Sequence, residues 1–142
     1  MLSAVRLTQT IPALPVRDTK AAAAFYEARL GFDIPFQDEG FAKLQRDDAE
    51  VHLWQADDEG WSQRGDLVRT PVSSGAESFI AGTASCRIQV DEVDDLYVEM
   101  RTAAVLHYAD PGSAQDTDWG TREFAVTDLD GNLVVFFRRN QE

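Results

Sequence analysis

A pattern of strand, capping residue and helix that occurs twice constrains the fold of this chain more than any other feature. In the first half, Leu14-Pro-Val-Arg-Asp18 precedes a helical pattern that carries the aromatic pair Phe25-Tyr26. In the second half, Ile88-Gln-Val-Asp91 precedes a similar pattern that carries the pair Leu96-Tyr97. Short alternating segments, of the kind that form strands, follow each helix. The sequence therefore predicts a βαβββ unit that is used twice.

The first unit is predicted over residues 10–56. Aromatic and alanine residues recur with helical spacing after Asp18, and Gly31 offers a left-handed helix end. We therefore expect a helix from Thr19 to Leu30. The strands of this unit are predicted over residues 10–16, 33–37, 41–46 and 51–56.

A long connection over residues 57–83 leads to the second unit, which is predicted over residues 84–138. Asp91 can cap a helix whose apolar face runs from Val93 to Met100. The turn Asp128-Leu-Asp-Gly-Asn132 separates the last two strands. The strands of this unit are predicted over residues 85–90, 122–127 and 133–138.

Together the two units indicate an α+β protein with one domain over residues 1–142. Two βαβββ modules can form a cupped, mixed β-sheet half-barrel, and the inner face of such a cup is a natural pocket. A chain of 142 residues is long enough to bury a core without disulfide bonds. The single cysteine, Cys86, excludes an internal disulfide and fits a reducing compartment.

The charge of the chain indicates which partners it attracts. Twenty-five acidic residues against 13 basic ones give a formal net charge of −12. Such a field repels phosphate backbones and raises the encounter rate with cations, so we expect no nucleic-acid partner. The N-terminal residues lack a continuous apolar run. We therefore expect no signal peptide and no membrane span, and a cytoplasmic location.

Several motifs resemble the vicinal oxygen chelate superfamily, which includes glyoxalases, ring-cleaving dioxygenases and drug-binding proteins. They are Val16-Arg-Asp18, Ala24-Phe-Tyr26, Leu30-Gly-Phe32 and the turn Asp128-Leu-Asp-Gly-Asn132. Further segments look like the bleomycin resistance proteins: Asp38-Glu-Gly-Phe41, Val51-His-Leu-Trp54, the run from Gly75 to Cys86, Asp94-Asp-Leu-Tyr97 and Trp119-Gly-Thr-Arg-Glu-Phe124. The likeness covers nearly the whole chain.

This resemblance implies a protein without enzymatic activity. Members of the family are homodimers that sequester bleomycin-type glycopeptides, free or copper-loaded, in two grooves at the subunit interface. The antibiotic is cationic and carries a flat bithiazole. Phe41 and Trp119 match the family positions that sandwich this ring system.

The residues themselves suit such a guest, because aromatic faces bind flat rings and acids attract positive charge. Phe41 and Trp119 both follow acidic, turn-like stretches. The ordinary alternative is that both are half-buried residues at strand ends. The full set of expected ligand-binding residues is Phe36, Asp38, Phe41, Asp48, Trp54, Trp61, Asp118 and Trp119.

The enzymes of the superfamily hold a divalent metal at four positions, two in each half. On this chain these positions fall near Ile11, His52, Ser85 and Val135. Aliphatic side chains cannot bind a metal, and one histidine cannot hold a catalytic one. We therefore predict no metal, no cofactor and no catalytic residue.

Two alternatives stay open. One is a metal-dependent lyase, isomerase or dioxygenase with unexpected ligands such as Gln9, Glu50 and His52. The other is a protein of the same design that binds a different planar, cationic small molecule.

Overall fold

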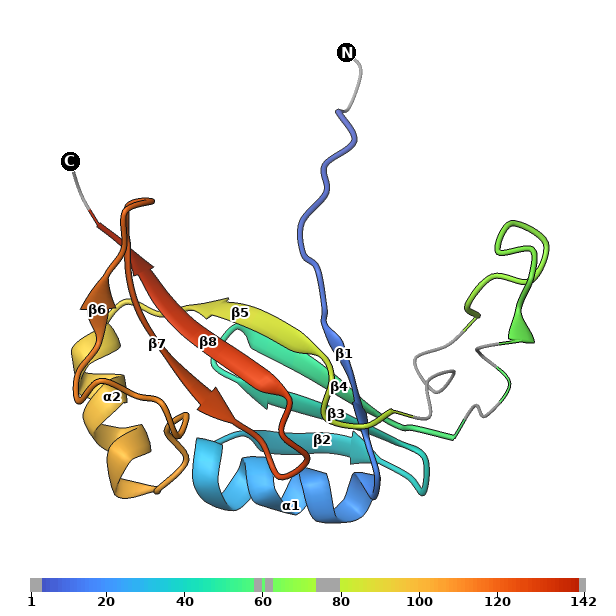
Figure 1. Cartoon of the computed structure of the whole chain (residues 1–142), viewed down its shortest axis with the longest axis horizontal. Coiled ribbons are helices and arrows are strands. Elements are labelled where there is room, and N and C mark those ends of the chain that lie inside the picture. The colour runs from blue at the N-terminus through green and yellow to red at the C-terminus, as the bar shows by residue number, and fades with distance from the viewer. Residues whose placement is uncertain (1–3, 58–59, 61–62, 74–79, 141–142) are drawn as a thin grey trace.

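Two four-stranded mixed sheets, each with one helix on one face, form the body of the molecule (Figure 1). This computed structural model describes residues 4–57, 60, 63–73 and 80–140. The elements are β1 (Ala13–Val16), α1 (Thr19–Leu30), β2 (Asp33–Gln37), β3 (Phe41–Arg46), β4 (Ala49–Gln55), β5 (Ser85–Gln89), α2 (Val93–Thr102), β6 (Gln115–Asp116), β7 (Thr121–Thr127) and β8 (Leu133–Arg139).

Both sheets have the same strand arrangement. The first sheet has the order β1-β4-β3-β2 and the second the order β5-β8-β7-β6. In each sheet the first strand of the unit pairs in parallel with the last one, and the other pairs are antiparallel. The predicted α+β class and the repeated βαβββ unit are confirmed, and neither sheet closes into a barrel. The division at residues 10–56, 57–83 and 84–138 stays a prediction.

Local signals determine helix α1. The side chain of Asp18 accepts a hydrogen bond from the backbone N–H of Ala21 at 3.1 Å, which caps the first turn. Gly31 takes the left-handed conformation, with φ 75°, and ends the helix. The predicted range from Thr19 to Leu30 is confirmed.

Other boundaries differ from the predicted ones. Strand β1 begins at Ala13 rather than at residue 10, and β4 begins at Ala49 rather than at residue 51. Glu92 takes the N-cap position of α2 in place of Asp91, without a side-chain hydrogen bond. The short strand β6 was not predicted, because two residues carry no periodicity.

Alternating burial shows which face of each sheet meets its helix. In the first sheet, Ala42, Leu44, Val51 and Leu53 are buried, and α1 contacts β3 and β4 on that side. The residues between them on each strand point to the opposite side, which we call the open face. In the second sheet the buried set is Phe124, Val126, Val134 and Phe136, and the ring of Tyr97 on α2 lies 5.3 Å from that of Phe124.

The turn between β7 and β8 links the two halves through buried polar groups. The hydroxyl of Tyr26 donates a hydrogen bond to Asp128 at 2.9 Å. The side-chain amide of Asn132 donates to the carbonyl oxygen of Pro15 at 3.0 Å and accepts from the backbone N–H of Ala84 at 3.0 Å. This turn therefore bonds to β1 and α1 as well as to its own half.

Cys86 lies against this turn and should react slowly. Burial, and the nearby charge of Asp128, raise the pKa of the Cys86 thiol from 9.0 to about 11. Only the thiolate is a nucleophile, so alkylation by iodoacetamide at pH 8 should be about 100-fold slower than in the unfolded chain. The rate should rise about tenfold per pH unit until pH 11. A rate that levels off near pH 9 in the folded protein would contradict this prediction.

Neither helix in the described part of the chain is long and apolar enough to cross a membrane.

Candidate functional site

An aromatic cluster lies on the open face of the first sheet. The ring of Phe41 lies 4.7 Å from that of Trp54, 6.0 Å from that of Phe36 and 5.0 Å from the imidazole of His52. Phe41 and Trp54 are directly opposite each other across β3 and β4. Phe36 remains 52% exposed, so the cluster offers aromatic surface to a flat guest.

Polar residues continue this face beside the cluster. The Nε2 atom of His52 lies 2.7 Å from a carboxylate oxygen of Glu50, and the ammonium of Lys43 lies 3.9 Å from the same oxygen. Lys43 and Glu50 balance part of each other's charge. His52 therefore contacts Phe41 on one side and a carboxylate on the other.

A second candidate region is the hairpin tip between β6 and β7. Here the backbone N–H of Thr117 donates to the carbonyl oxygen of Thr121 at 2.8 Å. Gly120 has φ 87°, the left-handed conformation that a three-residue hairpin loop requires at its last position. The loop holds Asp118 and Trp119 outward, and Trp119 is 68% exposed. Asp118 has no ion-pair partner in the described part of the chain.

One chain does not bring its two principal aromatic candidates together. Figure 1 shows the β2–β3 turn, which precedes Phe41, and the β6–β7 tip, which carries Trp119, at opposite ends of the molecule. A sandwich that uses both side chains on one ring system therefore needs two copies of the chain.

The remaining candidates have different surroundings. Asp38 accepts a hydrogen bond from the backbone N–H of Gly40 at 3.0 Å and so shapes the turn before Phe41. Asp48 lies in the β3–β4 turn, at the far end of the hairpin from Phe41 and Trp54. Trp61 lies outside the described residues.

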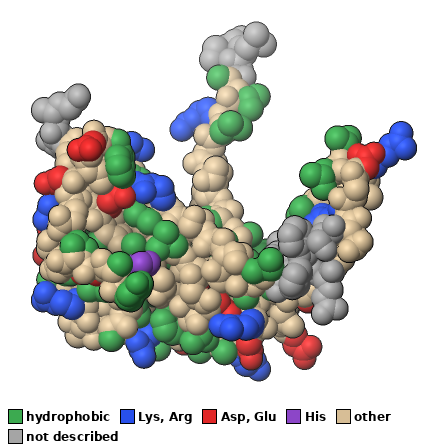
Figure 2. Space-filling model, viewed as in Figure 1, with side chains coloured by type: hydrophobic (Ala, Val, Ile, Leu, Met, Phe, Trp, Pro, Cys, Tyr) green, Lys and Arg blue, Asp and Glu red, His purple; other side chains and the backbone are tan. Residues whose placement is uncertain are grey.

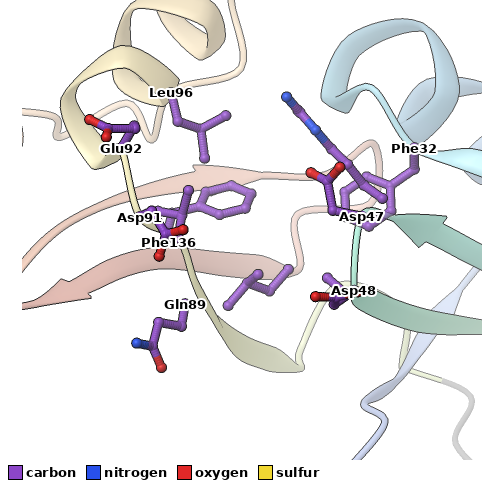
Figure 3. Close-up of a pocket in the computed structure, with 12 residues that line it drawn as sticks. Phe32, Asp47, Asp48, Gln89, Asp91, Glu92, Leu96 and Phe136 are labelled. Atoms are coloured by element: carbon purple, nitrogen blue, oxygen red, sulfur yellow. The ribbon is translucent and has the colours of Figure 1, made fainter.

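Asp48 also lies on the rim of the pocket drawn in Figure 3, which has a volume of about 520 Å³. Its floor includes Phe32, Leu96 and Phe136, and its acidic rim consists of Asp47, Asp48, Asp91 and Glu92. In Figure 3 the first two of these acids lie on one side of the pocket and the last two on the other. None of the candidate aromatic residues in the described part of the chain lines this pocket.

The residues at the four superfamily metal positions do not fit a metal. Ile11 and Val135 are aliphatic, and Ser85 is a weak ligand. The described residues contain no group of three or more His, Cys, Asp or Glu side chains that could hold a metal ion. His52 with Glu50 supplies at most two donors. The residues at these positions therefore do not supply the donor set of a catalytic metal site.

Sequence reasoning missed a polar network behind Trp119. It consists of Thr117 and Thr121 on the hairpin tip, Glu123 on β7 and Arg87 on β5. Alternation along β7 could have placed Glu123 on the face of the second sheet that points away from α2, but its partner on β5 is distant in sequence.

Comparisons with known proteins agree with this architecture. Residues 7–136 match the family model of the glyoxalase/bleomycin resistance protein/dioxygenase superfamily. Bleomycin resistance proteins from Geobacillus stearothermophilus and Staphylococcus aureus are each 47% identical over 134 residues, which is 94% of this chain and 98% of theirs. The structure of a bleomycin-binding protein from bleomycin-producing Streptomyces verticillus, complexed with copper(II)-bleomycin, is similar with a TM-score of 0.69. It is 27% identical, and the match covers 98% of this chain and 100% of that one.

Proposed function

Because the chain belongs to the glyoxalase/bleomycin resistance protein/dioxygenase superfamily, and within it to the bleomycin resistance proteins, we propose that it binds and sequesters bleomycin-type glycopeptides without modifying them. The observation that carries this proposal is 47% identity over nearly the full length of proteins named for bleomycin resistance. Resistance then results from stoichiometric capture of the antibiotic. The net charge of −12 favours the approach of a cationic guest.

The ligand site combines the two aromatic regions. The bithiazole stacks between Phe41 and Trp119, with Phe36 and Trp54 beside Phe41. Asp38 and Asp118 are exposed next to these rings and attract the amines of the guest. Asp48 and Trp61 stay predicted contacts of the same ligand.

Two stacks alone cannot hold the antibiotic tightly. Each contributes about 0.5–1.5 kcal/mol beyond burial, whereas a nanomolar complex needs about −12 kcal/mol. The rest must come from enclosure of the ligand in a groove. Since Phe41 and Trp119 lie at opposite ends of the folded molecule, the groove forms between two copies of the chain. The functional unit is therefore a homodimer with two grooves.

The N-terminal arm, residues 4–12, supports this dimer. Figures 1 and 2 show it as a narrow segment that stands away from the body, with hydrophobic side chains along it. Val5 is 94% exposed and Leu7 is 97% exposed. Apolar side chains on an extended segment contribute to stability only when another surface removes them from water. A second copy of the chain provides that surface.

Replacing Val5 and Leu7 together by Asp should therefore weaken the dimer by at least about tenfold, since two desolvated charges would replace apolar contacts. Sedimentation velocity at micromolar concentration measures the change. Val98→Asp, at an exposed apolar position on α2, is the matched control and should leave the dimer intact. A monomeric wild-type protein would overturn the homodimer, and an unchanged double variant would remove the arm from the interface.

A tryptophan-fluorescence titration with metal-free and copper-loaded bleomycin tests the function. We expect saturable quenching with one ligand per chain, because Trp119 is exposed at the site. Mass spectrometry of the recovered antibiotic should show no change in mass. No quenching at tens of micromolar ligand would redirect the search to another planar cation, and a modified product would indicate an enzyme.

The proposed location of the protein rests on its cysteine content. With a single cysteine the chain can form no internal disulfide, which fits a reducing compartment, and we propose the cytoplasm. Fractionation of cells that express the protein would test this.

A further inference from the structure

The side chain of Trp119 is exposed, yet the loop that carries it is fixed on both sides. Besides the bond between Thr117 and Thr121, the backbone N–H of Asn140 donates to the carbonyl oxygen of Gly120 at 2.8 Å. An exposed aromatic residue on a fixed loop is typical of binding sites, because a guest then meets surface that is already ordered.

A pair of threonine hydroxyls extends this fixation beneath the loop. The Oγ1 atoms of Thr117 and Thr121 lie 2.8 Å apart, and the Thr117 Oγ1 accepts from the backbone N–H of Thr121 at 3.1 Å. The Thr121 hydroxyl donates to Glu123 at 2.7 Å. A hydroxyl has one proton, and Thr121 donates its proton to Glu123, so toward Thr117 it can only accept. The Thr117 hydroxyl therefore donates either to the Thr121 hydroxyl or to the backbone carbonyl oxygen of Thr121. The carboxylate, which only accepts, thus gives the chain of hydrogen bonds one direction.

Arg87 on β5 holds this carboxylate across β8, on the same face of the sheet. Its Nη2 and Nη1 atoms lie 2.7 Å and 3.4 Å from the two oxygens of Glu123. The guanidinium itself lies over the ring of Phe137 on β8, 4.7 Å from its centre. Arg87, the Thr121 hydroxyl and the side chain of Trp119 lower the pKa of the Glu123 carboxyl against the opposing effect of burial, so it is ionised at neutral pH.

We propose that Glu123, held by Arg87, is the positioning residue for Trp119 in ligand binding. It acts through the Thr121 hydroxyl, and it keeps the hairpin tip in the conformation that stacks on a planar guest. A tip ordered before binding loses less conformational entropy when the complex forms. The inference rests on the proposed function, but its first consequence, a rigid indole, exists in the free protein.

The test compares Glu123→Ala with Glu99→Ala. Glu99 on α2 forms an equally close pair with Arg46 on β3, at 2.7 Å and 2.9 Å, and within the described residues it has no hydrogen bond or ion pair to the hairpin tip. The first measurement is the ¹H–¹⁵N heteronuclear NOE of the Trp119 indole in free protein, assigned with Trp119→Phe. We expect a value close to the backbone average in the wild type and in Glu99→Ala, and a clear decrease in Glu123→Ala.

The second measurement is the affinity for bleomycin. Glu123→Ala should weaken binding about tenfold, and Glu123→Gln should restore part of it, because the amide oxygen still accepts from Thr121. Glu99→Ala should bind like the wild type. If Glu123→Ala keeps both the NOE and the affinity of the wild type, the pair is an ordinary surface ion pair and the positioning role is wrong. If the wild type fails to bind, the proposed function fails, and the NOE alone decides the positioning role.

Discussion

Replacing Trp119 by Ala should weaken bleomycin binding about 30-fold, the largest loss of affinity that we expect from any single change. Trp119 is an exposed aromatic side chain on an ordered tip, the kind of residue that carries much of the energy of an interface. Its removal deletes one face of the stack and the area that the ring would cover, about 2 kcal/mol. Isothermal titration calorimetry would measure this loss.

Two controls make the result specific. Tyr108→Ala removes an aromatic side chain that is even more exposed but lies outside the site, and it should bind like the wild type. Trp119→Phe keeps a ring and should lose only a few-fold, because the stack survives with a smaller face. Equal affinity of Trp119→Ala and wild type would remove the hairpin tip from the ligand site.

The parts of the fold that local chemistry determines could be predicted from the sequence. Helix α1 followed from its alanine content, the cap at Asp18 and the stop at Gly31. The strand β6 could not be predicted, because Gln115 and Asp116 form a strand only by pairing with β7. The early start of β4 has a similar cause, since Ala49 pairs with Arg46 across the turn.

For the candidate site, residue types could be predicted better than their arrangement. The sequence indicated that Phe41 and Trp119 are suited to a flat guest. Their separation to opposite ends of the folded molecule follows from the packing of the two halves. It also grouped Asp48 with the ring residues, although the β3–β4 register puts it at the other end of the hairpin. The arrangement of the site residues depends on strand register and tertiary packing, which cannot be read from a single sequence.

The largest effect on stability should come from Asp128→Ala, which removes the centre of the junction between the two halves. The Asp128 carboxylate is 6% exposed and accepts from the Tyr26 hydroxyl at 2.9 Å, from the Asn132 side chain at 3.0 Å and from the backbone N–H groups of Asp130 and Asn132, both at 2.9 Å. Without it, several buried donors lack a partner, and each costs about 1–3 kcal/mol. We expect a total loss of about 3–5 kcal/mol, or about 10–20 °C in Tm.

Urea denaturation would measure this loss, and two further variants identify its source. Leu129→Ala changes the adjacent, half-exposed residue of the same turn and should cost about 0.5 kcal/mol or less, so it controls for any change in the loop. Tyr26→Phe removes one donor but leaves the carboxylate with its other partners, so it should cost about 1 kcal/mol.

Burial and Asp128 raise the pKa of the Tyr26 hydroxyl, so the wild type should also lose stability above about pH 10, where the unfolded tyrosine ionises first. Tyr26→Phe should reduce this alkaline loss of stability. For the junction itself, equal stability of Asp128→Ala and Leu129→Ala would show that Asp128 does not hold the two halves together.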